Sequence, residues 1–141
     1  MNKLAIITAF LGAVKNRYMV YQEDRSLEEK FLMASKVEGV DGLELCYPAD
    51  FDDLKKLKEL LKNYNFDVSA INFRSRRTGK WWRGSFTSKS MSERQDFIDE
   101  VKKAMDAAGE VGCDRITTCP LNDGSDYLFE MDYIKAYDDA A

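Results

Sequence analysis

The chain has 141 residues, of which 45% are hydrophobic, and a formal net charge of −4. This length and composition are typical of one globular domain, and the acidic balance disfavours nucleic acid as the main partner. The three cysteines form no C-x-x-C pair, and the absence of histidine removes the commonest general base and the commonest transition-metal ligand from this chain.

The first apolar run predicts a buried strand over Leu4–Phe10. The whole apolar stretch is too short to span a membrane, and no small-residue cleavage site follows it, so we expect a cytoplasmic protein with no membrane partner. The cysteines are then expected to be small core residues in a reducing compartment. A loop rich in tyrosine and charge should cover Lys15–Arg25. A helix should open at Ser26, where Glu29 completes a capping box.

The middle of the chain predicts a second and a third strand with a helix between them. The second strand is expected over Gly42–Tyr47, because Pro48 stops it. A helix capped by Asp50 should then run to Tyr64, since its leucines form one apolar stripe at helical spacing. The third strand is expected over Val68–Phe73.

A long insertion separates the third strand from the next helix. It covers Arg74–Met91, and we expect the helix to start at Ser92, with Gln95 completing a second capping box. A fourth strand should cover Arg115–Cys119. Met131–Ala141 has the pattern of the first turns of another helix.

Three similar phrases connect these helices to the strands that follow them: Gly39–Leu45, Asn65–Ile71 and Gly112–Thr118. In each, a Gly or Asn that can end a helix precedes an Asp and a β-rich run. Repeated strand–helix–strand units predict an α/β fold with four parallel strands. The long connections all follow strands, and ligands bind at the carboxyl ends of parallel strands. The functional side should therefore be that edge of the sheet.

Two polar residues inside predicted strands are candidates for chemistry. Glu44 could bind a sugar hydroxyl or act as a catalytic base, although a strand glutamate can also pair with a Lys or Arg of a neighbouring strand. Asn72 is a candidate for binding substrate hydroxyls, because Asn is disfavoured in strands and its placement needs a reason.

The insertion and the last loop supply further candidates for substrate binding. Arg74 and Arg76 could hold an anionic group, and Trp81 and Trp82 could stack on a sugar face. The same residues could instead form a subunit or domain interface, and basic residues interleaved with aromatics also suit nucleic acid. Asn122 and Asp123 are candidates in the loop after the fourth strand, where they could equally be turn formers.

The order of these pieces resembles a known family. Gly39–Leu45 after a capped helix, and Ala107–Ile116 before the fourth strand, are similar to helix-to-strand transitions of xylose isomerase-like TIM barrels. That superfamily includes sugar phosphate isomerases and epimerases and the endonuclease IV group. The resemblance implies that residues 1–141 are the N-terminal half of a single barrel domain, because a complete barrel has eight strands. We expect this domain to be incomplete.

The resemblance also implies a function for the complete barrel. It would be a metal-dependent isomerase or epimerase that acts on a carbohydrate by proton abstraction next to a carbonyl. The Mn, Mg or Zn ion would be held by residues of strands 5 to 8, so no metal ligand is expected in this chain, and the segment alone should be inactive. The expected partner is the remainder of the barrel or a second copy, in a homo-oligomer. Two alternatives stay open: a lyase similar to the C-glycoside deglycosidases of oxidised sugars, and a non-catalytic half barrel that serves binding or assembly.

Overall fold

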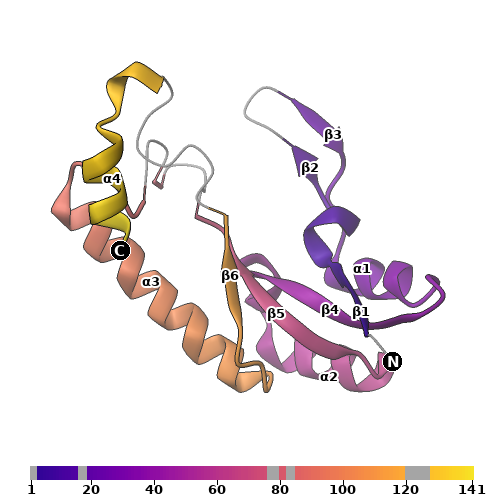
Figure 1. Cartoon of the computed structure of the whole chain (residues 1–141). Helices are drawn as coiled ribbons and strands as arrows, with labels where there is room; N and C mark the ends of the chain where they lie inside the picture. The colour runs from indigo at the N-terminus through magenta and orange to yellow at the C-terminus, as the bar shows by residue number, and fades with distance from the viewer. Residues whose placement is uncertain (1–2, 16–18, 76–79, 82–84, 120–127) are drawn as a thin grey trace.

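The computed structural model describes residues 3–15, 19–75, 80–81, 85–119 and 128–141 (Figure 1). Four parallel strands form the main sheet in the order β1-β4-β5-β6. Their bounds are Leu4–Ile7 for β1, Val40–Tyr47 for β4, Asp67–Phe73 for β5 and Ile116–Thr118 for β6. These are the four strands predicted from the sequence, and each lies beside the next one predicted along the chain. The predicted α/β class is therefore confirmed.

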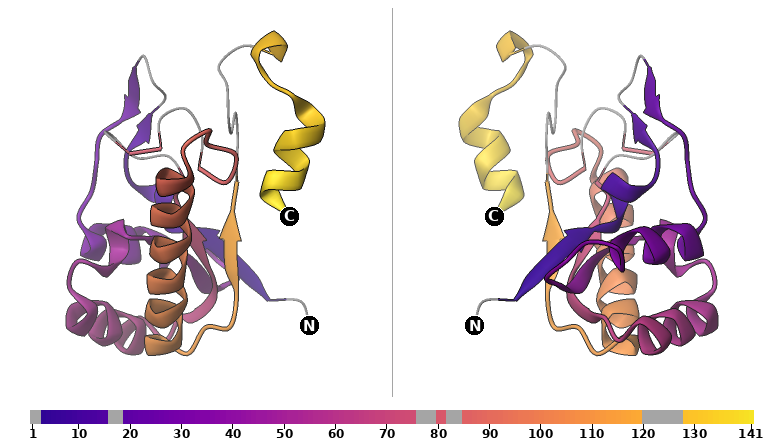
Figure 2. Two further views of the ribbon diagram at one scale, coloured as in Figure 1. Left: turned by 90° about the vertical axis from the view of Figure 1, so that its left-hand side faces the viewer. Right: turned by 90° about the vertical axis from the view of Figure 1, so that its right-hand side faces the viewer.

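Three helices pack against one face of this sheet, as the two side views show (Figure 2). They are α1 (Leu27–Ala34), α2 (Leu54–Tyr64) and α3 (Met91–Glu110). A fourth helix, α4 (Tyr133–Ala140), is linked to the start of α3 by an ion pair of 3.8 Å between Arg94 and Asp139. In the described part of the chain, no helix combines the length and the apolar composition needed to cross a membrane.

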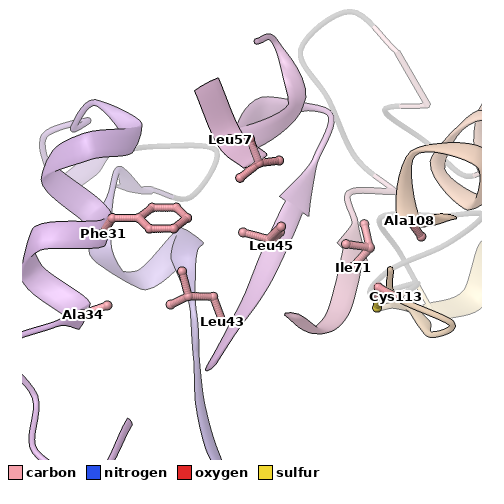
Figure 3. Close-up of a cluster of buried hydrophobic side chains, with 8 residues drawn as sticks. All are labelled: Phe31, Ala34, Leu43, Leu45, Leu57, Ile71, Ala108 and Cys113. Carbon is pink, nitrogen blue, oxygen red and sulfur yellow. The ribbon is translucent and has the colours of Figure 1, made fainter. Parts of the chain in front are cut away.

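The helices and the sheet enclose a core of apolar side chains (Figure 3). Its buried members are Phe31, Ala34, Leu43, Leu45, Leu57, Ile71, Ala108 and Cys113. A second cluster lies under α3 and contains Phe73, Trp81, Phe97 and Ala104. Side chains alternate between the two faces of a strand. Leu43 and Leu45 of β4 and Ile71 of β5 face the helices. Their neighbours Glu44 and Asn72 therefore face the other side of the sheet.

Helix ends agree with the expected turn chemistry. Asn65 ends α2 in the left-handed conformation with φ 54°, while Gly39 and Gly112 have φ of 81° and 71°. The capping box at the start of α1 is confirmed: the Ser26 hydroxyl accepts from the Glu29 N–H, and the Ser26 N–H donates to the Glu29 carboxylate at 2.8 Å.

Two other helix starts differ from the prediction. Asp53, not Asp50, caps α2 and accepts from the Lys56 N–H at 3.0 Å. Asp50 lies instead in the short 3-10 helix η2 (Ala49–Phe51), where its side chain is buried. Ser90, not Ser92, caps α3. In both cases several polar residues competed for one cap, and the geometry of the preceding loop selected among them.

The segment after β1 also differs from the prediction. The first strand ends at Ile7, and a 3-10 helix, η1, covers Thr8–Leu11. The predicted loop contains a short antiparallel hairpin of β2 (Val14–Lys15) and β3 (Val20–Gln22). All three cysteines are free. Cys46 and Cys113 are buried as expected, whereas Cys119 is exposed because it follows the end of β6.

Candidate functional site

Three polar side chains stand on neighbouring strands, on the sheet face opposite the helices. Glu44 belongs to β4, Asn72 to β5 and Thr117 to β6, and all three are half-buried. Asn72 and Thr117 are register partners across β5 and β6. Alternation along each strand places them there, because Leu43, Ile71 and Ile116 pack toward the helices.

Hydrogen bonds join these three side chains into one group. The Glu44 Oε1 atom accepts from Asn72 Nδ2 at 2.8 Å and from Thr117 Oγ1 at 2.8 Å. The same Asn72 nitrogen lies 3.4 Å from Thr117 Oγ1 and donates to it. The second oxygen, Oε2, has no hydrogen-bond partner among the described residues. Oε1 is thus held in place, and Oε2 can accept a proton or a hydrogen bond from a substrate hydroxyl.

The structure therefore brings together two of the residues singled out in the sequence, Glu44 and Asn72. The neutral partners of Glu44 replace the Lys or Arg considered as its alternative partner. Thr117 was missed, although the alternation of Ile116, Thr117 and Thr118 was a usable signal: it places the middle residue on the face away from the core.

The insertion after β5 is only partly described. Arg74 is exposed at the carboxyl end of β5, where its backbone N–H donates to the Tyr47 carbonyl at 3.2 Å. Arg76 and Trp82 in the insertion, and Asn122 and Asp123 in the later loop, lie outside the described residues. Their proposed roles in substrate binding stay predictions.

Trp81 is not the open stacking surface expected from its position in a polar insertion. Its side chain is only 4% exposed, and its ring packs edge-on against Phe97, with the ring centroids 5.0 Å apart. The ring centroids of Phe73 and Trp81 are 6.1 Å apart, and the Lys80 ammonium lies 4.7 Å from the Trp81 ring centroid. Trp81 packs against α3 because burial of the indole removes a large apolar surface from water. Trp81 is therefore a core residue.

A second polar group, which the sequence analysis missed, lies near the carboxyl ends of β1 and β4. Asp50 is 2% exposed and accepts hydrogen bonds from the Thr8 hydroxyl and from the Cys46 N–H, the latter at 2.8 Å. Its other oxygen accepts from Lys30 Nζ at 3.2 Å. These partners use both oxygens of the carboxylate, so the group joins η1, β4 and α1 structurally.

A hollow of about 290 Å³ lies apart from both groups, between α4 and the segment that leads into α3. Three acidic and three basic side chains line it: Glu130, Asp132, Asp139, Lys89, Arg94 and Lys135. Asp139 accepts from Lys135 at 2.8 and 3.0 Å, and this hydrogen bond lowers the pKa of Asp139. The formal charges of these six side chains cancel.

The described residues do not by themselves form a site for the divalent metal implied by the resemblance, whose ligands are expected on strands 5 to 8. No group of three or more Cys, Asp or Glu side chains in the described part of the chain is arranged to hold a metal ion, and the sequence has no histidine. Glu44 has an amide and a hydroxyl as neighbours, not further carboxylates. No chemical step below is therefore assigned to a metal.

Comparison with known proteins adds the family. A sequence model described as xylose isomerase-like TIM barrel matches residues 32–140. A search of curated proteins finds no significant match. Among solved structures, the fold is similar to that of the 3-keto-D-glucoside 4-epimerase YcjR from E. coli in its apo form, with a TM-score of 0.54 and 17% sequence identity. The match covers 91% of this chain and 48% of that chain, so this chain spans about half the length of that protein. The chain belongs to the xylose isomerase-like TIM barrel family.

Proposed function

We propose that this chain is part of a sugar isomerase or epimerase-like enzyme that removes a proton next to a carbonyl, with Glu44 as the base. The observation that carries the proposal is the Glu44 carboxylate, which has Oε1 held by Asn72 and Thr117 and Oε2 open. The family and the named activity of the structural neighbour, a 3-keto-D-glucoside 4-epimerase, support a keto sugar as the substrate class.

The proposed reaction balances without another reactant. Glu44 Oε2 takes the proton from the carbon next to the carbonyl, and the C–H electron pair forms the carbon–carbon double bond of an enolate. Return of a proton from water to the opposite face of the same carbon gives the epimer, and Glu44 then releases its proton to solvent. Protonation at the former carbonyl carbon, after a proton moves between the two oxygens, gives the isomer. Two fixed donors on Oε1 keep the base oriented, which contributes to rate through positioning.

Proton removal can be measured without knowing the natural substrate. The native protein, as its gene encodes it, is incubated with methyl 3-keto-D-glucoside in D₂O, and NMR follows loss of the C–H signals beside the carbonyl. Glu44→Gln keeps the shape of the side chain but removes the base. We expect exchange to fall by a factor of about 10² to 10⁴, the usual contribution of a general base.

Glu59→Gln is the matched control, because Glu59 is exposed on α2 and lies on the helix side of the sheet. It should exchange at the rate of the unchanged protein. Exchange by Glu44→Gln at that same rate, or no exchange by the unchanged protein, would contradict the proposal.

A further inference from the structure

The donors of Asn72 and Thr117 converge on one oxygen of Glu44. An ionised carboxylate has no donor, so the atom of Asn72 that lies 2.8 Å from Glu44 Oε1 must be the amide nitrogen. That nitrogen donates to Glu44 and also lies 3.4 Å from Thr117 Oγ1. The single O–H of Thr117 is donated to Glu44.

Two acceptor atoms of the group are left for a ligand. They are Glu44 Oε2 and Asn72 Oδ1, neither of which has a hydrogen-bond partner among the described residues. Neither atom is buried without a partner, so both are open to solvent. A hydroxyl can donate to either.

We propose that Thr117 is a positioning residue that holds the Glu44 carboxylate as the base. With Thr117 in place, Asn72 Oδ1 accepts from a substrate hydroxyl, and Glu44 Oε2 takes the proton from carbon. This inference rests on the proposed function, because it assumes that Glu44 is the base.

The positioning role is assigned to Thr117 on the basis of its contacts. Its hydroxyl is the only contact among the described residues that ties β6 to the Glu44 carboxylate, across a sequence separation of 73 residues. It also lies 3.4 Å from Asn72 Nδ2. Without the hydroxyl, the carboxylate is held by Asn72 alone among the described residues.

The test compares Thr117→Val with Thr117→Ser in the deuterium-exchange assay. We expect Thr117→Val to lower kcat about tenfold with KM changed less than twofold, because a hydrogen bond to a charged group is lost while the binding acceptors remain. Thr117→Ser keeps the hydroxyl and should recover most of the rate. An unchanged kcat in Thr117→Val, or no recovery in Thr117→Ser, would overturn the inference.

Thr118→Val is the matched control, because Thr118 is the next residue of β6 and shares the helix-facing side with Ile116. Its Oγ1 atom is buried with no hydrogen-bond partner in the described part of the chain. This variant should fold and exchange deuterium as the unchanged protein does. A loss of rate in Thr118→Val equal to that in Thr117→Val would show a general effect on β6 and overturn the assignment to Thr117.

The role of Asn72 is tested with the 2-deoxy and 4-deoxy analogues of methyl 3-keto-D-glucoside. In the unchanged protein, one of them should raise KM about tenfold, because a hydroxyl that donates to Asn72 Oδ1 is missing. In Asn72→Leu that analogue and its parent should have the same KM. Equal KM values in the unchanged protein would overturn the hydroxyl assignment. The Glu44→Gln variant tests the proposed function separately. Deuterium exchange at the full rate in Glu44→Gln would contradict the proposed function itself. A loss of exchange in Glu44→Gln together with an unchanged kcat in Thr117→Val would contradict only this inference.

Discussion

At the scale of single residues, Asp50 shows how a charged side chain can be buried. Thr8, Lys30 and Cys46 surround its carboxylate and supply three donors. Thr8 is fully buried, and Lys30 is only 8% exposed. Burial of such a pair costs desolvation energy, so its presence is weak evidence for added stability. Removal of one partner, however, leaves the other charge buried and unpaired.

Asp50→Asn should therefore lower the free energy of unfolding by about 3 kcal/mol, because Lys30 then loses its counter-charge. Urea unfolding followed by circular dichroism measures the change. Asp52→Asn is the matched control, since Asp52 is exposed and only two residues away. Equal free energies of unfolding for the two variants would contradict this prediction. They would mean that the Lys30 ammonium becomes solvated when Asp50 is replaced, so that no unpaired charge stays buried.

At the scale of elements, the start of α2 distinguishes two neighbouring aspartates. Asp53 accepts from the Lys56 N–H at 3.0 Å, whereas Asp50 is committed to the buried group. Asp53→Ala should cost about 1 kcal/mol of unfolding free energy, the usual value of a lost N-cap. Asp52→Ala, at an exposed position beside the cap, should change stability much less in the same urea experiment. A larger loss of stability in Asp52→Ala than in Asp53→Ala would contradict the assignment of Asp53 as the N-cap.

The capping box of α1 makes its stability depend on pH. The Ser26 backbone N–H and hydroxyl donate to Glu29 at 2.8 and 2.9 Å, and these hydrogen bonds, the backbone one first, lower the pKa of Glu29. The unfolded chain then binds this proton more readily than the folded chain does. The contribution of the box is present above the ordinary pKa of a glutamate and is lost as pH falls through the lowered value.

NMR titration of the Glu29 side chain checks this prediction. Its pKa should lie below the ordinary value of a glutamate. Ser26→Gly removes the hydroxyl and should move the Glu29 pKa upward while leaving the backbone donor. A Glu29 pKa at the ordinary value of a glutamate in the unchanged protein would show that the box does not persist in solution.

At the scale of the whole molecule, the described sheet has two outer strands, β1 and β6. Strands with an unpaired edge promote association with other chains. Several large apolar side chains are also exposed, among them Phe10 at 65%, Ile134 at 79% and Tyr137 at 77%. We therefore expect the 141-residue chain, expressed by itself, to associate.

Light scattering over a range of concentrations measures this association, and the apparent mass should rise with concentration. Ile134→Lys combined with Tyr137→Lys adds charge to one face of α4, and it should reduce association if that face takes part. Asp138→Lys is the matched control on an exposed part of the same helix. A stable monomer at every concentration would contradict the role given to the open edges and the exposed apolar residues.

The sequence by itself determined the order and the kind of the main elements. Apolar spacing in Leu54–Tyr64 and the turn residues Gly39, Asn65 and Gly112 depend on short stretches of backbone, so they can be interpreted locally. Glu44 and Asn72 were singled out because an ionised carboxylate and an Asn are unusual inside strands. Element ends were less certain, because Asp50 and Asp53 have nearly the same local signal as helix caps.

Only the tertiary structure decided which polar residues meet. The contact of Thr117 with Glu44 depends on the register of β4, β5 and β6, and that of Asp50 with Thr8 and Lys30 depends on how β1 and α1 pack against β4. Trp81 lies in the core because Phe73 and Phe97 offer it an apolar surface. These outcomes depend on long-range packing and hydrogen bonding, whose free energies involve groups tens of residues apart and leave no periodic signal in the sequence.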